Sequence, residues 1–279
     1  MPISTMLVPV GLEPREVKVL EYVCGLAVQS VKRVIVVTAV DASGMEAPVL
    51  AAEADRARER LAAITAPLRD CTMEYEIRVV IGDTTESILA LAQQDDIDLI
   101  CCGTEGKSVV DALFSGSVSE KLFVSGKIRT MTVRYDLLQS VEDPRVLSRG
   151  FARKLVVPTD FSASATRAWL SAIERPADAI GELRALHVLP DGAMNSERRE
   201  AEVLLDGLLD MAREHDVEAV SEIRFGDPAE VVLDYLDEVK ASGVITGQHG
   251  RGRLLRRVML GGLSLKLLRD APCPVVVQP

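Results

Sequence analysis

The chain alternates short apolar runs with longer segments in which apolar residues recur at helical spacing. Val34–Val40 is a continuous, mostly β-branched run, which is typical of a strand buried on both faces. From Leu50 to Leu68, apolar residues recur at steps of four and three, which predicts a long amphipathic helix. The strands predicted in the first half are Met6–Val10, Val34–Val40, Tyr75–Ile81, Leu99–Cys102 and Thr130–Val133, and the helices are Glu16–Val28, Leu50–Leu68, Ser87–Gln94 and Val118–Val124.

The second half repeats this order of elements. Gly82-Asp83 and Gly226-Asp227 each end a predicted strand and lie 144 residues apart, and Gly103 and Gly247 share that offset. A repeat on this scale indicates a duplicated domain. The predicted strands of this half are Leu155–Val157, Leu183–Leu189, Val220–Phe225, Gly243–Thr246 and Val275–Val277; its helices carry Trp169 (after an N-cap at Ser162 or Ser164), Leu204 to Met211, and Val231–Val239.

Strands that alternate with helices indicate a parallel sheet covered on both faces. Right-handed crossovers then predict two tandem α/β domains, each a doubly wound parallel sheet of roughly five strands flanked by helices. Residues 136–152 have no clear hydrophobic period and contain Pro144 and Gly150. We therefore assign residues 1–138 to the first domain, 139–150 to a linker and 151–279 to the second domain.

Composition and charge argue against some classes of binding partner. The formal net charge of -10 argues against nucleic-acid binding and against an anionic membrane surface, although residues 251–279 are locally basic. No apolar run approaches the roughly 20 residues that span a bilayer, and the N-terminus lacks a secretory pattern. The five cysteines form no metal-binding pattern, so we expect reduced, mostly buried thiols and a cytoplasmic protein.

The loops after the fourth predicted strands carry the candidate chemistry. In the first half, Gly103 and Gly106 precede Gly116-Ser117, and in the second half Gly247 and Gly250 precede a further glycine, Gly261. Glycines at a strand end let backbone N–H groups approach a ligand, and the following helix N-terminus favours an anion. The pattern suits a phosphate chain, and the alternative is a tight turn followed by an N-cap.

Other single residues have two interpretations each. Asp160, just past the first strand of the second half, is placed to accept from ribose hydroxyls, or it is a turn aspartate. His249 contacts phosphate or is solvated, whereas His187 is expected in the core and His215 at a helix end. Arg251, Arg253, Arg256 and Arg257 gather phosphates or an acidic partner, or form a solvated helix face.

Familiar catalytic and nucleotide motifs fail. Cys101 stands where a P-loop ending at Lys107-Ser108 requires its first glycine, and Leu255 stands where a dinucleotide fingerprint requires a small residue. No nucleophile elbow, metal-ligand cluster or carboxylate pair at a recognisable spacing is present in the sequence. These motifs therefore support neither a P-loop NTPase nor a dinucleotide dehydrogenase.

At these residues the chain resembles a tandem universal stress protein. The resemblance rests on VPTDFS after the first strand of the second half, a GD pair at a strand end, the glycine loop and the ending APCPVVV. It implies a fold like that of the adenine nucleotide alpha hydrolases, ATP as ligand, and magnesium only together with nucleotide. It also implies domains paired through their last strands, so that two domains in one chain form an internal pseudo-dimer, with a homodimer as a further option.

The resemblance carries ATP-binding roles onto residues of both halves, but each half departs from the pattern. The first half has Gly11 where the second has Asp160, and the second half has Gly262 where the first has the hydroxyl of Ser117. The implied contacts are Pro158, Thr159, Asp160, Val188, Gly247, Gly250, Gly261 and Gly262 in the second half, and Gly103, Gly106, Gly116 and Ser117 in the first. His249 joins the second set because it lies inside the glycine loop.

Three functions follow as hypotheses. The leading one is a stress or regulatory protein that binds adenine nucleotide in one of two degenerate sites, first of all the second. The alternative is a scaffold that docks proteins and binds no nucleotide. A slow ATPase or nucleotidyl transferase comes third, because the sequence places no general base, and we expect no enzyme activity.

Overall fold

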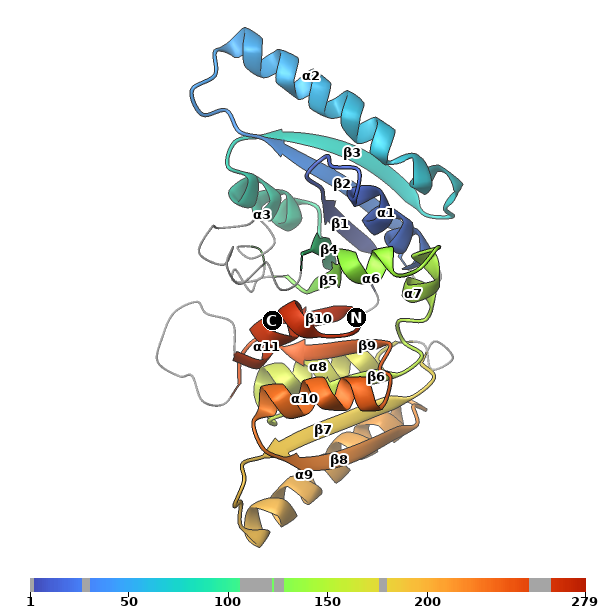
Figure 1. Cartoon of the computed structure of the whole chain (residues 1–279), viewed down its shortest axis with the longest axis vertical. Coiled ribbons are helices and arrows are strands. Elements are labelled where there is room, and N and C mark those ends of the chain that lie inside the picture. Colours follow the sequence, from blue (N-terminus) through green and yellow to red (C-terminus); the bar gives the residue numbers. More distant parts are fainter. Residues whose placement is uncertain (1–2, 27–30, 106–121, 123–127, 176–179, 251–261) are drawn as a thin grey trace. The chain divides into compact units, whose positions relative to one another are not determined.

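The computed structural model describes residues 3–26, 31–105, 122, 128–175, 180–250 and 262–279. The chain divides into two compact units, an N-terminal unit of residues 3–105 and 109–149 and a C-terminal unit that holds residues 150–279. In Figure 1 the first is coloured from blue to green and the second from yellow to red. Each unit is a parallel sheet flanked by helices, which confirms the predicted fold class.

The N-terminal unit has the strand order β3-β2-β1-β4-β5. All pairings within this order are parallel. Because the chain runs outward from β1 to β3 and then crosses to β4, the order switches between β1 and β4. Its elements are β1 (Thr5–Pro9), α1 (Glu16–Gly25), β2 (Arg33–Val40), α2 (Ala47–Ile64), the 3₁₀ turn η2 (Ala66–Asp70), β3 (Glu74–Ile81), α3 (Thr84–Gln94), β4 (Leu99–Thr104), β5 (Thr130–Arg134), α6 (Tyr135–Gln139) and α7 (Arg145–Arg149).

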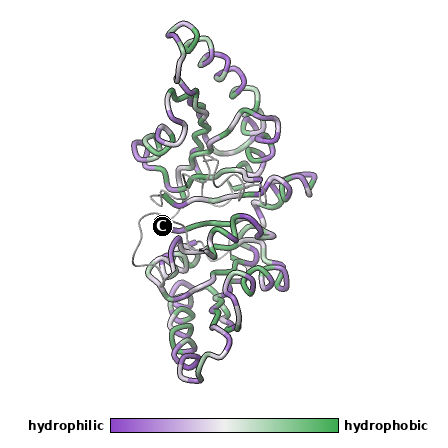
Figure 2. The backbone as a smooth tube through the Cα atoms, turned by 60° about the vertical axis from the view of Figure 1, so that its left-hand side comes forward, coloured by the Kyte–Doolittle hydropathy of each residue, from purple (hydrophilic) through white to green (hydrophobic). Residues whose placement is uncertain are grey.

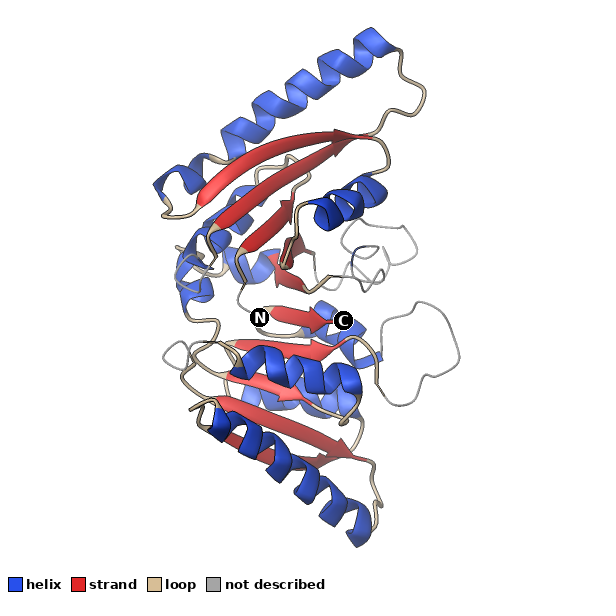
Figure 3. Ribbon diagram, turned by 180° about the vertical axis from the view of Figure 1, so that it is seen from behind, coloured by secondary structure: helices blue, strands red, loops and turns tan. Residues whose placement is uncertain are grey.

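The C-terminal unit repeats this arrangement with the order β8-β7-β6-β9-β10, again parallel throughout. Its switch in strand order therefore lies between β6 and β9. Figure 3 shows helices on both faces of its strands. Its elements are β6 (Leu155–Pro158), α8 (Ala163–Ile173), β7 (Leu183–Leu189), α9 (Asn195–Glu214), β8 (Ala219–Phe225), α10 (Pro228–Glu238), β9 (Gly243–Gly247), α11 (Gly262–Asp270) and β10 (Val275–Gln278).

The cores follow the hydrophobic pattern. Val34–Val37 of β2 are fully buried, as expected for a strand covered on both faces. In the C-terminal unit, Trp169 of α8 is fully buried, and its indole N–H donates to the Leu208 carbonyl at 3.0 Å. The helices show purple and green residues alternating along their coils in Figure 2, which is typical of one buried face.

The repeated Gly-Asp pairs perform the same local task in both units. Gly82 and Gly226 both have a φ of 128°, a conformation that favours glycine. The carboxylates that follow, Asp83 and Asp227, cap α3 and α10 by each accepting two backbone N–H bonds. The sequence repeat thus corresponds to a repeat in structure.

Two segments differ from the sequence-based expectation. The predicted helix from Leu50 to Leu68 ends at Ile64, because Pro67 lies in a short 3₁₀ turn that follows. The segment assigned as a linker carries the short helix α7, and Ser148 and Arg145 lie so close to Gly25 of α1 that no side chain fits there. Helix Val118–Val124 lies outside the described residues except for Leu122.

The expectation of five reduced cysteines is wrong for two of them. Cys24 and Cys71 form a disulfide, because the end of α1 and the turn after η2 bring their Cα atoms to 5.7 Å. Cys101, Cys102 and Cys273 are buried and stand outside this disulfide, as expected of reduced thiols. The cysteines therefore no longer support the cytoplasmic assignment, which stays a prediction. Within the described residues, no helix has the length and apolar character of a membrane span.

Candidate functional site

A cavity lies where the strand order of the C-terminal unit switches, at the carboxyl ends of the paired strands β6 and β9. Figure 1 shows where these two strands lie in the sheet. The volume of the cavity, about 280 Å³, is near the lower end of the range of ligand pockets. The residues that line it are Pro158, Thr159, Asp160, Ala165, Leu186, Val188, Pro228, Val232, Thr246, Gly247, His249, Gly250, Gly262, Leu263 and Ser264.

Hydrogen bonds to β7 and within the loop itself fix the loop after β6. The Thr159 N–H donates to the Leu186 carbonyl at 2.9 Å, which extends the pairing of β6 with β7. Phe161 adopts a φ of 60°, and its N–H donates to the Thr159 hydroxyl at 3.0 Å. The Ser162 N–H donates to Asp160 Oδ1 at 3.0 Å, so that the carboxylate of Asp160 is fixed at the cavity.

The glycine loop after β9 approaches this carboxylate closely. A Cβ at Gly250 would lie 2.8 Å from Asp160 Oδ2, and a Cβ at Gly247 would lie 2.7 Å from the backbone of Ser164. At Gly247 only glycine fits against this backbone, whereas a side chain at Gly250 would displace the Asp160 carboxylate. The hydroxyl groups of Ser162 and Ser164 donate to the His249 carbonyl and tie the two loops together.

Eight of the nine residues expected in the second half therefore line one cavity, although the sequence places them in four separate segments. Their role as ligand contacts stays a prediction. Gly261 and the arginines at positions 251, 253, 256 and 257 lie outside the described residues.

Sequence reasoning missed the apolar wall and one hydroxyl. Leu186, Val188 and Val232 form an apolar side of the cavity. Only Val188 among them was expected, because the other two read as ordinary strand and helix core positions. Ser264 lies two residues after Gly262 and brings a hydroxyl group to the cavity, but that hydroxyl donates to the Gly247 carbonyl at 2.9 Å. Ser264 thus fixes the loop.

The histidines are placed by local contacts. His187 Nδ1 lies 2.7 Å from the Thr159 carbonyl, and its ring centroid lies 4.6 Å from that of Phe161. It is half-buried beside the loop after β6, a more exposed place than the core position expected. His215 follows α9 and lies 3.0 Å from the Met211 carbonyl, as expected of a helix end. His249 is exposed at the rim of the cavity.

The corresponding corner of the N-terminal unit contains different side chains. Glu16 and Tyr135 are both buried, and the Tyr135 hydroxyl donates to Glu16 Oε1 at 2.9 Å. The guanidinium of Arg15 lies 4.8 Å from the Tyr135 ring centroid and pairs with Glu105. A Cβ at Gly103 would lie 2.5 Å from the Tyr135 ring. Of the residues expected in this half, Gly106, Gly116 and Ser117 lie outside the described residues.

Burial governs the ionisation of this pair. Desolvation raises the pKa of the Glu16 carboxyl, and the bonds from Tyr135 and the Gly11 N–H oppose that shift. Burial and the neighbouring carboxylate raise the pKa of Tyr135, so that its hydroxyl keeps its proton and acts as a donor.

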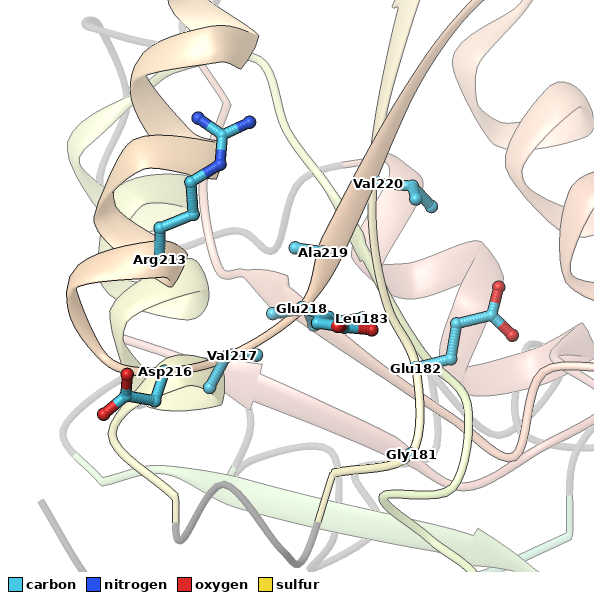
Figure 4. Close-up of a pocket in the computed structure, with 9 residues that line it drawn as sticks. All are labelled: Gly181, Glu182, Leu183, Arg213, Asp216, Val217, Glu218, Ala219 and Val220. Atoms are coloured by element: carbon cyan, nitrogen blue, oxygen red, sulfur yellow. The ribbon is translucent and has the colours of Figure 1, made fainter.

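A larger hollow of about 510 Å³ lies at the amino ends of β7 and β8, away from the switch edge (Figure 4). Glu182 pairs with Arg184, and Arg213 pairs with Asp210. The charged ends of Glu182, Arg213 and Asp216 point in different directions in Figure 4. The charged side chains of the larger hollow therefore do not converge on one point, and the smaller cavity is the better candidate for a ligand site. In the described part of the chain, no cluster of side chains is suited to hold a metal ion.

Comparison with known proteins identifies the family. The model of the universal stress protein family matches residues 2–134 and again residues 152–279. A universal stress protein of Methanocaldococcus jannaschii is 27% identical over an alignment of 138 residues, and the match covers 45% of this chain and 81% of that protein.

Solved structures agree on the fold. A universal stress protein from Archaeoglobus fulgidus matches 98% of this chain and 97% of its own, with a TM-score of 0.75 and 22% identity. A structure from Pseudomonas aeruginosa assigned to the same family matches 99% of this chain and 93% of its own, with a TM-score of 0.62 and 15% identity. Because the family model matches both halves, the chain belongs to the universal stress protein family, as a tandem of two domains.

Proposed function

We propose that the C-terminal unit binds an adenine nucleotide, with ATP as the first ligand to test, in a stress-response or regulatory role. The observation that carries the proposal is the meeting of Asp160 and Gly250 at the cavity where the strand order switches. A carboxylate and an exposed stretch of glycine backbone suit the ribose and the phosphates of one ligand.

The parts of the cavity match the parts of the nucleotide. Asp160 accepts from the ribose hydroxyls, and the backbone N–H groups of the glycine loop donate to phosphate oxygens. Leu186, Val188 and Val232 offer an apolar wall for the adenine ring. Magnesium enters only with the phosphates.

The proposal is for binding without turnover. Among the described residues that line the cavity, Asp160 and His249 are the ionisable ones. Asp160 is engaged with the ribose in this assignment, and His249 is exposed at the rim. ATP hydrolysis by the purified protein is therefore expected at the level of buffer alone.

Replacement of Asp160 tests the site. Asp160→Ala removes the ribose acceptor, and the lost charge-assisted hydrogen bonds are expected to weaken ATP binding about ten- to a hundredfold or more. Titration calorimetry with ATP and magnesium measures the loss. Asp206→Ala removes an exposed carboxylate from α9, away from the cavity, and is the matched control that keeps wild-type affinity. Equal affinity of the Asp160→Ala variant and the wild type would contradict the proposal.

A second measurement, together with calorimetry, distinguishes nucleotide binding from the scaffold alternative. Mass spectrometry of small molecules released from fresh protein is expected to detect ATP or ADP. A protein that carries no nucleotide and gives no heat with ATP would instead favour a scaffold that acts by docking other proteins.

A further inference from the structure

The two units share the turn that follows their first strands, so their candidate sites can be compared position by position. Leu12 in the N-terminal unit has a φ of 62°, and Phe161 in the C-terminal unit has a φ of 60°. Non-glycine residues rarely adopt this conformation, so its recurrence aligns the two loops. Each of these residues follows the aligned pair Gly11 and Asp160 directly, and five residues after that pair stand Glu16 in one unit and Ala165 in the other.

The Glu16 carboxylate points toward the loop that follows β1. Its Oε1 accepts from the Gly11 N–H at 3.3 Å and from the Tyr135 hydroxyl at 2.9 Å. Its Oε2 is buried and has no hydrogen-bond partner among the described residues. The N-terminal unit therefore keeps a negative charge of its own at the N-terminus of α1, and that charge uses a backbone donor that an incoming anion would need.

The Tyr135 ring fills the space beside Gly103. A Cβ at Gly103 would lie 2.5 Å from this ring, whereas at the aligned Gly247 it would meet the backbone at the start of α8. In both units a contact joins the loop after the first strand to the loop after the fourth. In the N-terminal unit it is the ion pair of Arg15 with Glu105. At the aligned positions of the C-terminal unit, the Ser164 hydroxyl donates to the His249 carbonyl. Among the described residues, the Glu16 carboxylate and the Tyr135 ring thus occupy the N-terminal corner.

We propose that Glu16 excludes nucleotide from the N-terminal unit, so that each chain takes one adenine nucleotide, in the C-terminal unit. The inference rests on the proposed function for the location of the bound nucleotide. Phosphate oxygens brought beside a buried carboxylate meet like charge in a medium that screens it poorly. Ala165 imposes no such repulsion at the aligned position, because its side chain is apolar and lines the cavity.

The test opens the N-terminal site in a protein whose C-terminal site is weakened. In an Asp160→Ala background, Gly11→Asp and Glu16→Ala together restore the ribose acceptor and remove the resident charge. A Cβ at Gly11 has Glu16 Oε1 as its nearest neighbour at 3.6 Å, so a Cβ fits there, and Glu16→Ala removes the carboxylate nearest to it. Photo-crosslinking with 8-azido-ATP, followed by peptide mapping, reports which unit is labelled.

We expect the wild type to be labelled only within residues 150–279. The variant with Gly11→Asp, Glu16→Ala and Asp160→Ala is expected to show at least tenfold more label within residues 3–149 than Asp160→Ala alone. Glu13→Ala in place of Glu16→Ala removes a more exposed carboxylate of the same loop and is expected to add no label. Glu16→Gln in place of Glu16→Ala keeps an acceptor for Tyr135 and serves if the alanine variant does not fold.

The outcomes separate this inference from the proposed function. Label in both units of the wild type, or none in the N-terminal unit of the folded glutamine and alanine variants, would overturn the role of Glu16. A wild type without any label, beside a variant labelled in residues 3–149, would leave the role of Glu16 standing and would refute nucleotide binding by the C-terminal unit.

Discussion

Glu16 is a carboxyl group whose surroundings disfavour its charge. It is 6% exposed, and one of its oxygens has no hydrogen-bond partner in the part of the chain that the structure describes. Desolvation raises its pKa, while the Tyr135 hydroxyl, the Gly11 N–H and the charge of Arg15 lower it, and Glu13 adds a small repulsion. The net shift is upward, so the folded protein binds the Glu16 proton more tightly than the unfolded chain does. The resulting contribution to stability is present below the unfolded pKa and is lost as pH rises through the folded pKa.

Glu16→Gln is therefore expected to raise the Tm at neutral pH. The amide is neutral and keeps an oxygen for Tyr135 and Gly11, so it avoids the cost of a buried charge. The gain over the wild type should shrink as pH falls toward about 4, near the ordinary pKa of glutamic acid, because the wild-type carboxyl is then protonated as well. Thermal unfolding at both pH values measures this. Glu200→Gln, at an exposed site on α9, is the control. A gain that is the same at both pH values would contradict the charge explanation.

At the scale of elements, the disulfide joins the end of α1 to the turn after η2. Cys24 and Cys71 are 47 residues apart. In the chain-entropy model, closing a loop of this length lowers the entropy of the unfolded chain and so raises the free energy of unfolding by about 4 kcal/mol. The disulfide also fixes the end of α1, the helix that begins at Glu16, and so helps to position Glu16 in the N-terminal corner.

Reduction with a phosphine is expected to lower the free energy of unfolding of the N-terminal unit by about 4 kcal/mol or somewhat less. Denaturant unfolding with and without the reductant measures the difference. A variant with Cys24→Ser and Cys71→Ser should be insensitive to the reductant. Five titratable thiols in the denatured, unreduced protein would show that the bond is absent, because the chain has five cysteines in total.

Across the whole molecule, local patterns predicted the elements and long-range contacts decided the rest. Leu183–Leu189 was predicted with the bounds that the structure has, because its apolar run is bracketed by turns. The disulfide joins residues far apart in sequence, so no local period signals it. The contact of Glu16 with Tyr135 was missed for the same reason, since the two residues are 119 positions apart. Gly250 was predicted from its motif, whereas its approach to Asp160 required the fold.

The asymmetry between the halves gives the last prediction, for hydrogen exchange along the whole chain. ATP that binds only the folded C-terminal unit stabilises it by about 2.7 kcal/mol at a concentration of a hundred times Kd. Amide exchange is therefore expected to slow around residues 159–160, 247–250 and 262–264. The aligned segments at residues 10–11 and 103–105 should exchange as they do without ATP. Asp160→Ala at the same ATP concentration is the control, and its slowing in the C-terminal unit should be smaller, because a Kd raised ten- to a hundredfold leaves only about 0.4–1.4 kcal/mol of stabilisation. Slowing at residues 10–11 in the wild type would mean that Glu16 leaves the first site open.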